Sequence, residues 1–79
     1  MTPLHRRWEK GTRYYQIDLC RDLCGQWVLI RRWGRRGAAL GQTRRVPCDT
    51  YAGALSLLAR IQRRRLQRGY CAVNSLGLS

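Results

Sequence analysis

The hydrophobic period of this sequence changes near residue 50. Between residues 14 and 46, large apolar side chains alternate with polar ones or form short runs bounded by glycine, which is typical of β-strands. Between residues 50 and 68, apolar side chains instead recur every three or four positions, as in an amphipathic helix. This order predicts an α+β fold, in which a meander of about four to five antiparallel strands forms a small sheet and one amphipathic helix packs on one face.

The strands are marked with unequal clarity. Residues 14–20 alternate strictly, with Tyr15, Ile17 and Leu19 on one face. Residues 26–33 are apolar on both faces, so we expect a central strand that is partly covered on both sides and joined to the previous strand in a hairpin. Weaker signals predict a tail over residues 1–5, an edge strand over 8–11, an extended segment over 42–46 closed by Pro47, a last strand over 70–73 and a frayed end over 74–79.

The expected helix runs from Tyr51 to about Arg68. Asp49 or Thr50 can cap its first turn, and Gly69 ends it. Its apolar face is expected to cover the sheet, whereas we interpret its basic face mainly as a solvated surface, with nucleic-acid contact as the alternative. The apolar face comprises Tyr51, Ala54, Leu55, Leu58, Ile61 and Leu66, and the basic face comprises Arg60, Arg63, Arg64 and Arg68.

The charge of the chain limits its partners. Fifteen Arg and one Lys face only four acidic residues, so the formal net charge is +12. A compact domain with this charge repels itself unless a polyanion neutralises it, which makes nucleic acid the leading partner and an anionic membrane a weaker one. The preference for Arg supports nucleic acid, because guanidinium forms bidentate hydrogen bonds with phosphate and guanine and stacks on aromatic rings.

The sequence also indicates the cellular location of the protein and the redox state of its cysteines. No apolar run approaches the ~20 residues of a membrane span, and residues 1–7 lack the apolar stretch of a signal peptide. We therefore expect a cytoplasmic protein without membrane contact, nucleoid-associated as a narrower alternative, whose cysteines are reduced. A zinc site that includes His5 is a minor alternative, because the cysteine spacings contain no Cys-X-X-Cys pair. The cysteines are Cys20, Cys24, Cys48 and Cys71.

Catalysis is not expected. The only histidine, His5, falls in the predicted tail, and the four acidic residues are scattered near turns, so no acid–base pair is apparent. No cysteine has a histidine partner in the sequence pattern, and no phosphate-binding loop of the GxxxxGK type occurs. We expect no catalytic residue, no metal and no cofactor.

The densest functional signal lies where the predicted central strand ends in a glycine-rich loop. Arginines there can neutralise phosphates, and an exposed indole can stack on a base or cover a sugar, which suits the end or the single-stranded part of a nucleic acid. Trp8 and Trp27 lie in predicted strands and are expected in the core instead. The predicted nucleic-acid-binding residues are Arg31, Arg32, Trp33, Gly34, Arg35, Arg36, Arg44 and Arg45.

At these residues the sequence resembles the WGR domain, a family named after its Trp-Gly-Arg tripeptide, here Trp33-Gly34-Arg35. The resemblance extends from about Trp8 to Tyr70, nearly the whole chain. The spacing of its segments is far more specific than the tripeptide alone. Those segments are Tyr14-Tyr15, Gly25-Gln26-Trp27-Val28-Leu29, Arg32-Trp33-Gly34-Arg35, Gly37, Gly41-Gln42-Thr43 and Arg68-Gly69-Tyr70.

The resemblance implies a small sheet with one helix packed on it. Such domains occur beside the catalytic region of DNA-dependent poly(ADP-ribose) polymerases and as bacterial modules, stand-alone or fused. In the polymerases the domain contacts DNA near a strand break. The residue matched by Trp33 packs near a 5′ end there, and the residue matched by Arg35 makes DNA or interdomain contacts. Because this sequence contains no polymerase region, we expect only a DNA contact or a structural role for Arg35.

These observations predict a non-catalytic, stand-alone WGR protein of bacterial type that binds DNA without sequence preference, with strand ends or single strands as its expected targets. Residues 1–79 are expected to form one domain, with its core at about residues 8–72 and short flexible tails. Two alternatives remain open, namely RNA binding and a protein-interaction module whose basic face docks on an acidic partner. The sequence does not predict an oligomeric state.

Overall fold

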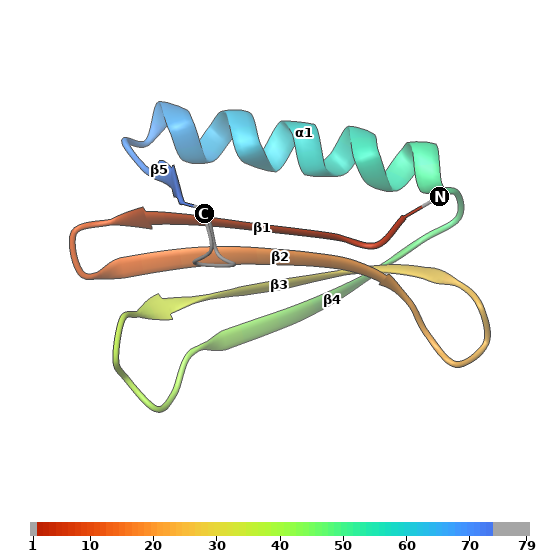
Figure 1. Cartoon of the computed structure of the whole chain (residues 1–79), viewed down its shortest axis with the longest axis horizontal. Coiled ribbons are helices and arrows are strands. Elements are labelled where there is room, and N and C mark those ends of the chain that lie inside the picture. The colour runs from red at the N-terminus through yellow and green to blue at the C-terminus, as the bar shows by residue number, and fades with distance from the viewer. Residues whose placement is uncertain (1, 74–79) are drawn as a thin grey trace.

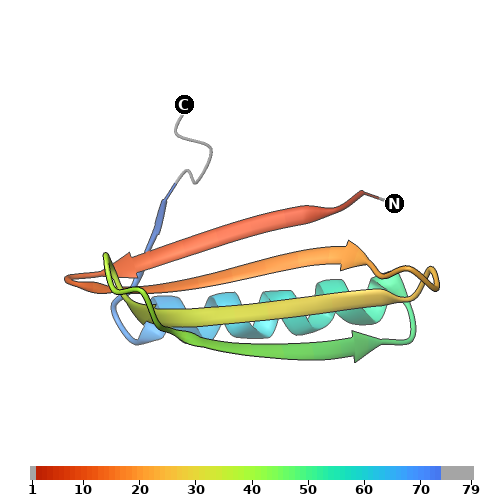
Figure 2. The ribbon, with the colours of Figure 1, turned by 90° about the horizontal axis from the view of Figure 1, so that it is seen from below.

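The computed structural model describes residues 2–73, and it confirms the α+β prediction. One helix crosses one face of a five-stranded antiparallel sheet with the order β4-β3-β2-β1-β5 (Figure 1). Seen from the other face, the long strands lie side by side with the helix behind them (Figure 2). The elements are β1 (Leu4–Lys10), β2 (Arg13–Arg21), β3 (Trp27–Arg35), β4 (Gln42–Cys48), α1 (Tyr51–Gln67) and β5 (Cys71–Val73).

The predicted hairpin between β2 and β3 is present. Its turn is closed by the Asp22 side chain, which accepts hydrogen bonds from the backbone N–H groups of Cys24 and Gln26, both at 2.9 Å. Gly25 has a φ of 84°, a conformation that only glycine adopts without strain. Aspartate and glycine therefore fix the register that pairs β2 with β3.

The N-terminal region differs from its prediction. Leu4 and His5 do not belong to a tail, since β1 begins at Leu4. Strand β1 is not an edge strand either, since β5 pairs with it along Arg7–Glu9. The reason is that Leu4 packs against the core and His5 contacts the side chain of Asp18. The predicted last strand is confirmed as β5. The predicted fraying of residues 74–79 lies outside the described residues.

Strand β4 is longer than predicted. It continues through Pro47 to Cys48 instead of ending before the proline. Because β4 is an edge strand, a proline within it does not have to donate a hydrogen bond to a further neighbour.

The helix has the predicted ends but a narrower buried stripe. The Thr50 side chain accepts a hydrogen bond from the N–H of Gly53 at 2.9 Å, and Gly69 follows the last turn with a φ of 89°. The prediction that Leu55 and Leu66 face the sheet is wrong, because their side chains are 37% and 50% exposed. The residues that are buried lie three or four positions apart, at Ala54, Leu58 and Ile61.

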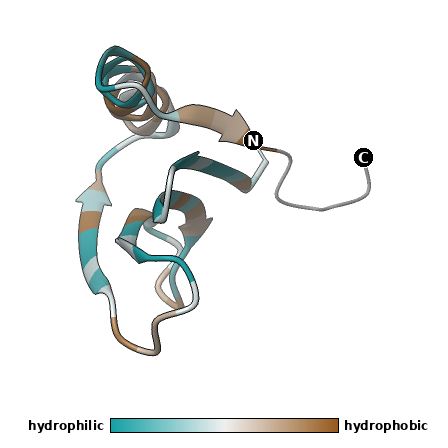
Figure 3. Cartoon of the chain, turned by 90° about the vertical axis from the view of Figure 1, so that its left-hand side faces the viewer, coloured by the Kyte–Doolittle hydropathy of each residue, from teal (hydrophilic) through white to brown (hydrophobic). Residues whose placement is uncertain are grey.

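The core lies between α1 and the face of the sheet that it covers. It includes Trp8 and Trp27, as predicted, together with the alternating residues of β2. On the other face, Val28 is buried and Ile30 is half-buried, so β3 has buried side chains on both faces, in agreement with the predicted partial cover. Within residues 2–73 no second layer covers that other face (Figure 3). We call the two faces the helix side and the open side.

Candidate functional site

The alternation of β3 divides the predicted binding residues between the two faces. Trp33 pairs with Tyr15, which is in the core, so Trp33 and its alternate neighbours Arg31 and Arg35 lie on the helix side. Arg32 and Gly34 therefore belong to the open side. On β4 the same register places Arg44, the partner of Arg31, on the helix side and Arg45 on the open side. The eight predicted residues do not form one continuous surface.

On the helix side, the end of β3 borders a pocket of about 200 Å³, which we call the Trp33 pocket. It lies where the C-terminal part of α1 meets the sheet. Three of its residues are arginines and four are aromatic, and none is acidic. The lining residues are Arg13, Tyr14, Tyr15, Trp33, Gly34, Arg35, Arg65 and Tyr70.

Trp33 is half-buried and held by its neighbours. Its ring stacks on Tyr15, with centroids 5.7 Å apart and planes 13° from parallel. The Arg31 guanidinium lies 5.7 Å from the Trp33 ring centre, and its Nε donates a hydrogen bond of 2.6 Å to the Tyr15 hydroxyl. The indole is thus fixed in one orientation while part of it remains accessible from the pocket.

Arg65 is a site residue that the sequence analysis missed. Its guanidinium carbon lies 4.4 Å from the ring centre of Tyr15 and 5.2 Å from that of Tyr70. Its Nε is buried and has no hydrogen-bond partner among the described residues. The signal was present in the helical spacing, since Arg65 follows Ile61 by four positions on the stripe that faces the sheet. The guanidinium of Arg65 is thus held beside two aromatic rings and adds a positive charge to the wall of the Trp33 pocket.

Gly34 has a packing role. A Cβ atom at this position would lie 3.2 Å from the Cα of Gly41 and 3.5 Å from the Tyr14 ring. A Cβ at Gly41 would lie 2.9 Å from both the Trp33 carbonyl oxygen and the Tyr14 hydroxyl. The distances of 2.9 and 3.2 Å are shorter than Cβ atoms tolerate easily. The two glycines therefore let the β3–β4 loop pack against Tyr14 beside the Trp33 pocket.

Three of the predicted arginines are paired with carboxylates. Arg32 lies 3.0 Å from Asp18, Arg45 lies 3.2 Å from Asp22, and Arg36 lies 3.7 Å from Glu9. Arg36 also donates a 3.2 Å hydrogen bond to the Gly11 carbonyl oxygen. These pairs reduce the net positive charge around three of the eight predicted residues.

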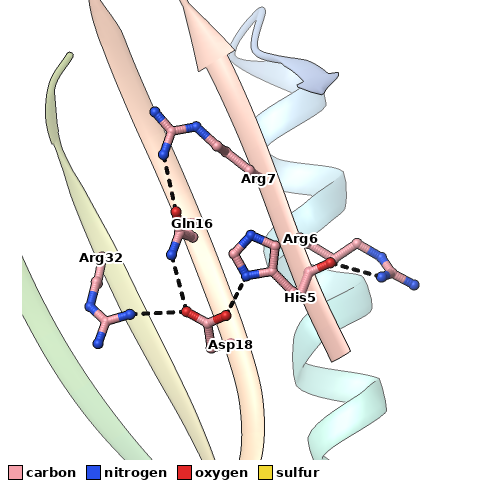
Figure 4. Close-up of polar contacts among 6 residues, drawn as sticks. All are labelled: His5, Arg6, Arg7, Gln16, Asp18 and Arg32. Atoms are coloured by element: carbon pink, nitrogen blue, oxygen red, sulfur yellow. Dashed lines mark hydrogen bonds and ion pairs between the residues drawn. The ribbon is translucent and has the colours of Figure 1, made fainter. Parts of the chain in front are cut away.

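Asp18 is the centre of a polar network on the open side (Figure 4). Its carboxylate contacts the Nδ1 of His5 and accepts a hydrogen bond from Gln16 at 3.1 Å, in addition to its contact with Arg32. Arg7 extends the network by donating to Gln16 at 3.0 Å and to Glu9 at 2.9 Å. The interpretation of His5 as part of a tail is therefore wrong, and its role in the structure is to join β1 to β2.

The described residues offer little to a metal ion. No group of three or more His, Cys, Asp or Glu side chains in residues 2–73 is close enough to hold one. All four cysteines are free thiols. Burial raises the pKa of the Cys48 thiol, the neighbouring Asp49 carboxylate raises it further, and a hydrogen bond from the Leu29 backbone lowers it. The helix described in residues 51–67 is not long and apolar enough to cross a membrane.

The chain is thus a small α+β scaffold with a basic, aromatic pocket at one end of its sheet. The family model described as "WGR domain" matches residues 4–76. The chain belongs to the WGR domain family, which confirms the resemblance. This family is generally associated with nucleic-acid binding, and its domain is a binding module and not a known catalytic domain. No curated protein and no solved structure matches the chain.

Proposed function

We propose that this chain is a single non-catalytic domain, spanning residues 1–79, that binds DNA in the cytoplasm without sequence preference. The observation that carries the proposal is the Trp33 indole, stacked on Tyr15 and bordered by guanidinium groups that face a pocket. Arginine and aromatic side chains together bind a phosphate and the sugar or base attached to it.

Strand ends and single-stranded segments are the DNA features that we propose for the Trp33 pocket. Bases inside a duplex are stacked on one another and expose only their edges, whereas a terminal or unpaired nucleotide exposes a ring face and a sugar. A half-buried indole in a recess of about 200 Å³ suits such a nucleotide better than the smooth surface of a groove.

We assign different roles to the predicted residues according to their face. Arg31, Trp33, Arg35 and Arg44 lie on the helix side and are the proposed contacts, together with Arg65. The open-side arginines are proposed to contribute to long-range attraction only, because carboxylates hold them. These are Arg32 and Arg45, with Arg36 similarly paired in the loop.

A titration of labelled nucleic acids at several salt concentrations tests this proposal. Blunt duplex, nicked duplex, single-stranded DNA and RNA are each followed by fluorescence anisotropy. With about five phosphate contacts, log affinity should fall with log salt at a slope near −4.5 for duplex, which is roughly two to three decades between 50 and 200 mM. Affinity that does not respond to salt would rule out nucleic-acid binding, and a preference for RNA would replace DNA as the ligand.

Replacement of the indole tests the pocket itself. Trp33→Ala should weaken binding to ends or single strands by ~1–3 kcal/mol, because one stacking partner is lost. Trp33→Phe is the matched control, since it keeps an aromatic ring on Tyr15, and it should retain most of the affinity. Circular dichroism and urea unfolding establish that both variants fold. A folded Trp33→Ala protein with unchanged affinity would remove the indole from the site.

A protein partner is the second candidate, favoured by the same exposed basic surface. Competition separates the two. An acidic partner that excess duplex and single-stranded DNA fail to displace would show that the basic surface serves protein docking first.

A further inference from the structure

A second recess adjoins the Trp33 pocket between α1 and β3. It has a volume of about 520 Å³, and five of its eight lining residues are arginines. We call it the α1 groove. Its lining residues are Arg31, Leu57, Arg60, Ile61, Arg63, Arg64, Gln67 and Arg68.

The charge of the α1 groove is not neutralised by the described part of the protein. Within residues 2–73, every ion pair involves a cation from outside the groove, namely His5, Arg7, Arg32, Arg36 or Arg45. Among these described residues, no carboxylate lies within ion-pair distance of the five groove arginines. Like charges gathered in a recess raise the local positive potential, which attracts a polyanion.

The groove and the Trp33 pocket are neighbours on the helix side, and Arg31 lies between them. This side chain lines the groove and also lies over the Trp33 ring, at 5.7 Å from its centre. On the helix, Arg64 lines the groove and the adjacent Arg65 lines the pocket. Both recesses therefore lie on the same side of the sheet, with neighbouring residues of α1 in their walls.

The dimensions suit a nucleic-acid strand. The groove residues from α1 and its C-cap extend from Leu57 to Arg68, about 17 Å at 1.5 Å per residue. A duplex strand places a phosphate every ~3.4 Å, so this length corresponds to about five phosphates. The lining contains no aromatic ring on which a base could stack, whereas guanidinium groups form bidentate hydrogen bonds with phosphate.

We propose that the α1 groove binds the sugar–phosphate backbone of the same nucleic acid whose terminal or unpaired nucleotide occupies the Trp33 pocket. This inference rests on the proposed function and adds a second contact surface to it. The domain then holds its ligand at two places, an aromatic pocket for one nucleotide and a basic groove for the strand that continues from it.

The test compares two double variants that remove the same charge. Arg60→Gln/Arg64→Gln alters the groove at exposed positions of α1, where glutamine is a good helix former. Arg6→Gln/Arg21→Gln is the matched control, because both arginines are exposed and line neither the groove nor the Trp33 pocket. Both proteins are titrated with a labelled blunt duplex between 50 and 400 mM salt, after unfolding curves have established that they fold.

We expect the groove variant to reduce the steepness of the salt dependence by about 1.8, which is ~0.9 for each lost phosphate contact. The corresponding loss of affinity at 50 mM salt is on the order of 100-fold. The control variant should keep the wild-type slope. Arg60→Lys/Arg64→Lys retains the charge and should restore most of the slope, which separates loss of contact from damage to the helix.

The outcomes distinguish this inference from the proposed function. If both double variants keep the wild-type slope while Trp33→Ala still weakens binding, the groove proposal is overturned and the Trp33 pocket stands. If the wild-type protein binds none of the nucleic acids in a salt-dependent way, the proposed function itself fails. Polyglutamate, an acidic polypeptide, is titrated with the same proteins. If the Arg60→Gln/Arg64→Gln variant binds polyglutamate more weakly than the wild type does but binds every nucleic acid equally well, the groove takes an acidic protein and the backbone proposal is overturned.

Discussion

The helix side and the open side of the sheet both carry arginines, but among the described residues the strand arginines that pair with acids lie on the open side. On the open side, Glu9 and Asp18 are interleaved with the arginines and pair with them. On the helix side, the centre is an apolar core, and the arginines around its edge have no carboxylate partner within residues 2–73. This difference in pairing is the reason that the proposed contacts were assigned to the helix side.

Adjacent residues illustrate the difference. Arg31 contacts the Tyr15 hydroxyl and lies over Trp33, whereas Arg32, the next residue, is paired with Asp18 on the opposite face. Two arginines that look equivalent in the sequence thus have opposite environments, because successive side chains of a strand point to opposite faces. One supports the binding pocket, and the other stabilises the sheet.

The largest expected difference between the faces concerns stability. Leu29 is fully buried on the helix side, so Leu29→Ala should lower the free energy of unfolding by ~2–5 kcal/mol through lost burial and the cavity left behind. Ile30 is its half-buried neighbour on the open side, and Ile30→Ala should cost about 1 kcal/mol. Urea unfolding followed by Trp fluorescence measures both. Equal losses would mean that the open side is covered by something outside residues 2–73.

Much of this comparison could be predicted from the sequence. The β2–β3 hairpin and the cap at Thr50 depend on neighbouring residues, so local patterns were sufficient to predict them. The placement of β1 between β2 and β5 was not predicted, because pairing between segments 60 residues apart leaves no local pattern. The apolar stripe of α1 was predicted too broadly, since hydrophobicity suggested Leu66 although the helical spacing selects Arg65.

For the candidate site, the sequence indicated which residue types gather near Trp33 but not how they are arranged on the two faces. The Arg-rich run around Trp33 indicated an anionic ligand, and the structure places an aromatic, basic pocket there. Which arginines are neutralised depends on cross-strand partners such as Asp18 and Asp22, which are more than ten residues away in sequence. The division between faces follows from strand register, and a single sequence fixes register only where one face is clearly apolar.

An intermediate effect is expected from Asp18, which tests whether the open side takes part in binding. Asp18→Asn removes the charge that holds Arg32 and contacts His5, and should cost about 1 kcal/mol or less in stability because the groups are partly exposed. If the nucleic acid lies only on the helix side, the salt slope of binding should stay unchanged. A steeper slope, by ~0.9, would mean that the released Arg32 acquires a phosphate contact.

Arg35→Gln is the matched control for Asp18→Asn. It removes one charge from the lining of the Trp33 pocket, so it should make the salt slope shallower by ~0.9 if Arg35 contacts a phosphate. Both variants are titrated with the same labelled duplex. A slope that changes with Asp18→Asn and not with Arg35→Gln would reverse the assignment of the two faces.

The smallest expected effect compares two thiols on opposite faces. Cys48 is buried on the helix side, and this burial raises the pKa of its thiol, whereas Cys20 is half-buried on the open side. At pH 8, alkylation followed by peptide mass spectrometry should label Cys48 more slowly than Cys20, by about tenfold for each unit by which the pKa is raised. Exposed Cys24 provides the upper limit of the rate.

The raised pKa of Cys48 also determines how the stability of the protein changes with pH. The pKa of the Cys48 thiol is higher in the folded than in the unfolded state. The contribution of this thiol to the free energy of unfolding is therefore complete below the unfolded pKa and is lost as pH rises through the folded pKa. Between pH 8 and pH 10.5, the free energy of unfolding should therefore decrease more for the wild type than for Cys48→Ala, which has no thiol to titrate at this position. Urea unfolding curves at several pH values measure both. Equal pH dependence, or labelling of Cys48 at the rate of Cys24, would show that water reaches the helix side at β4 and that the core ends before this strand.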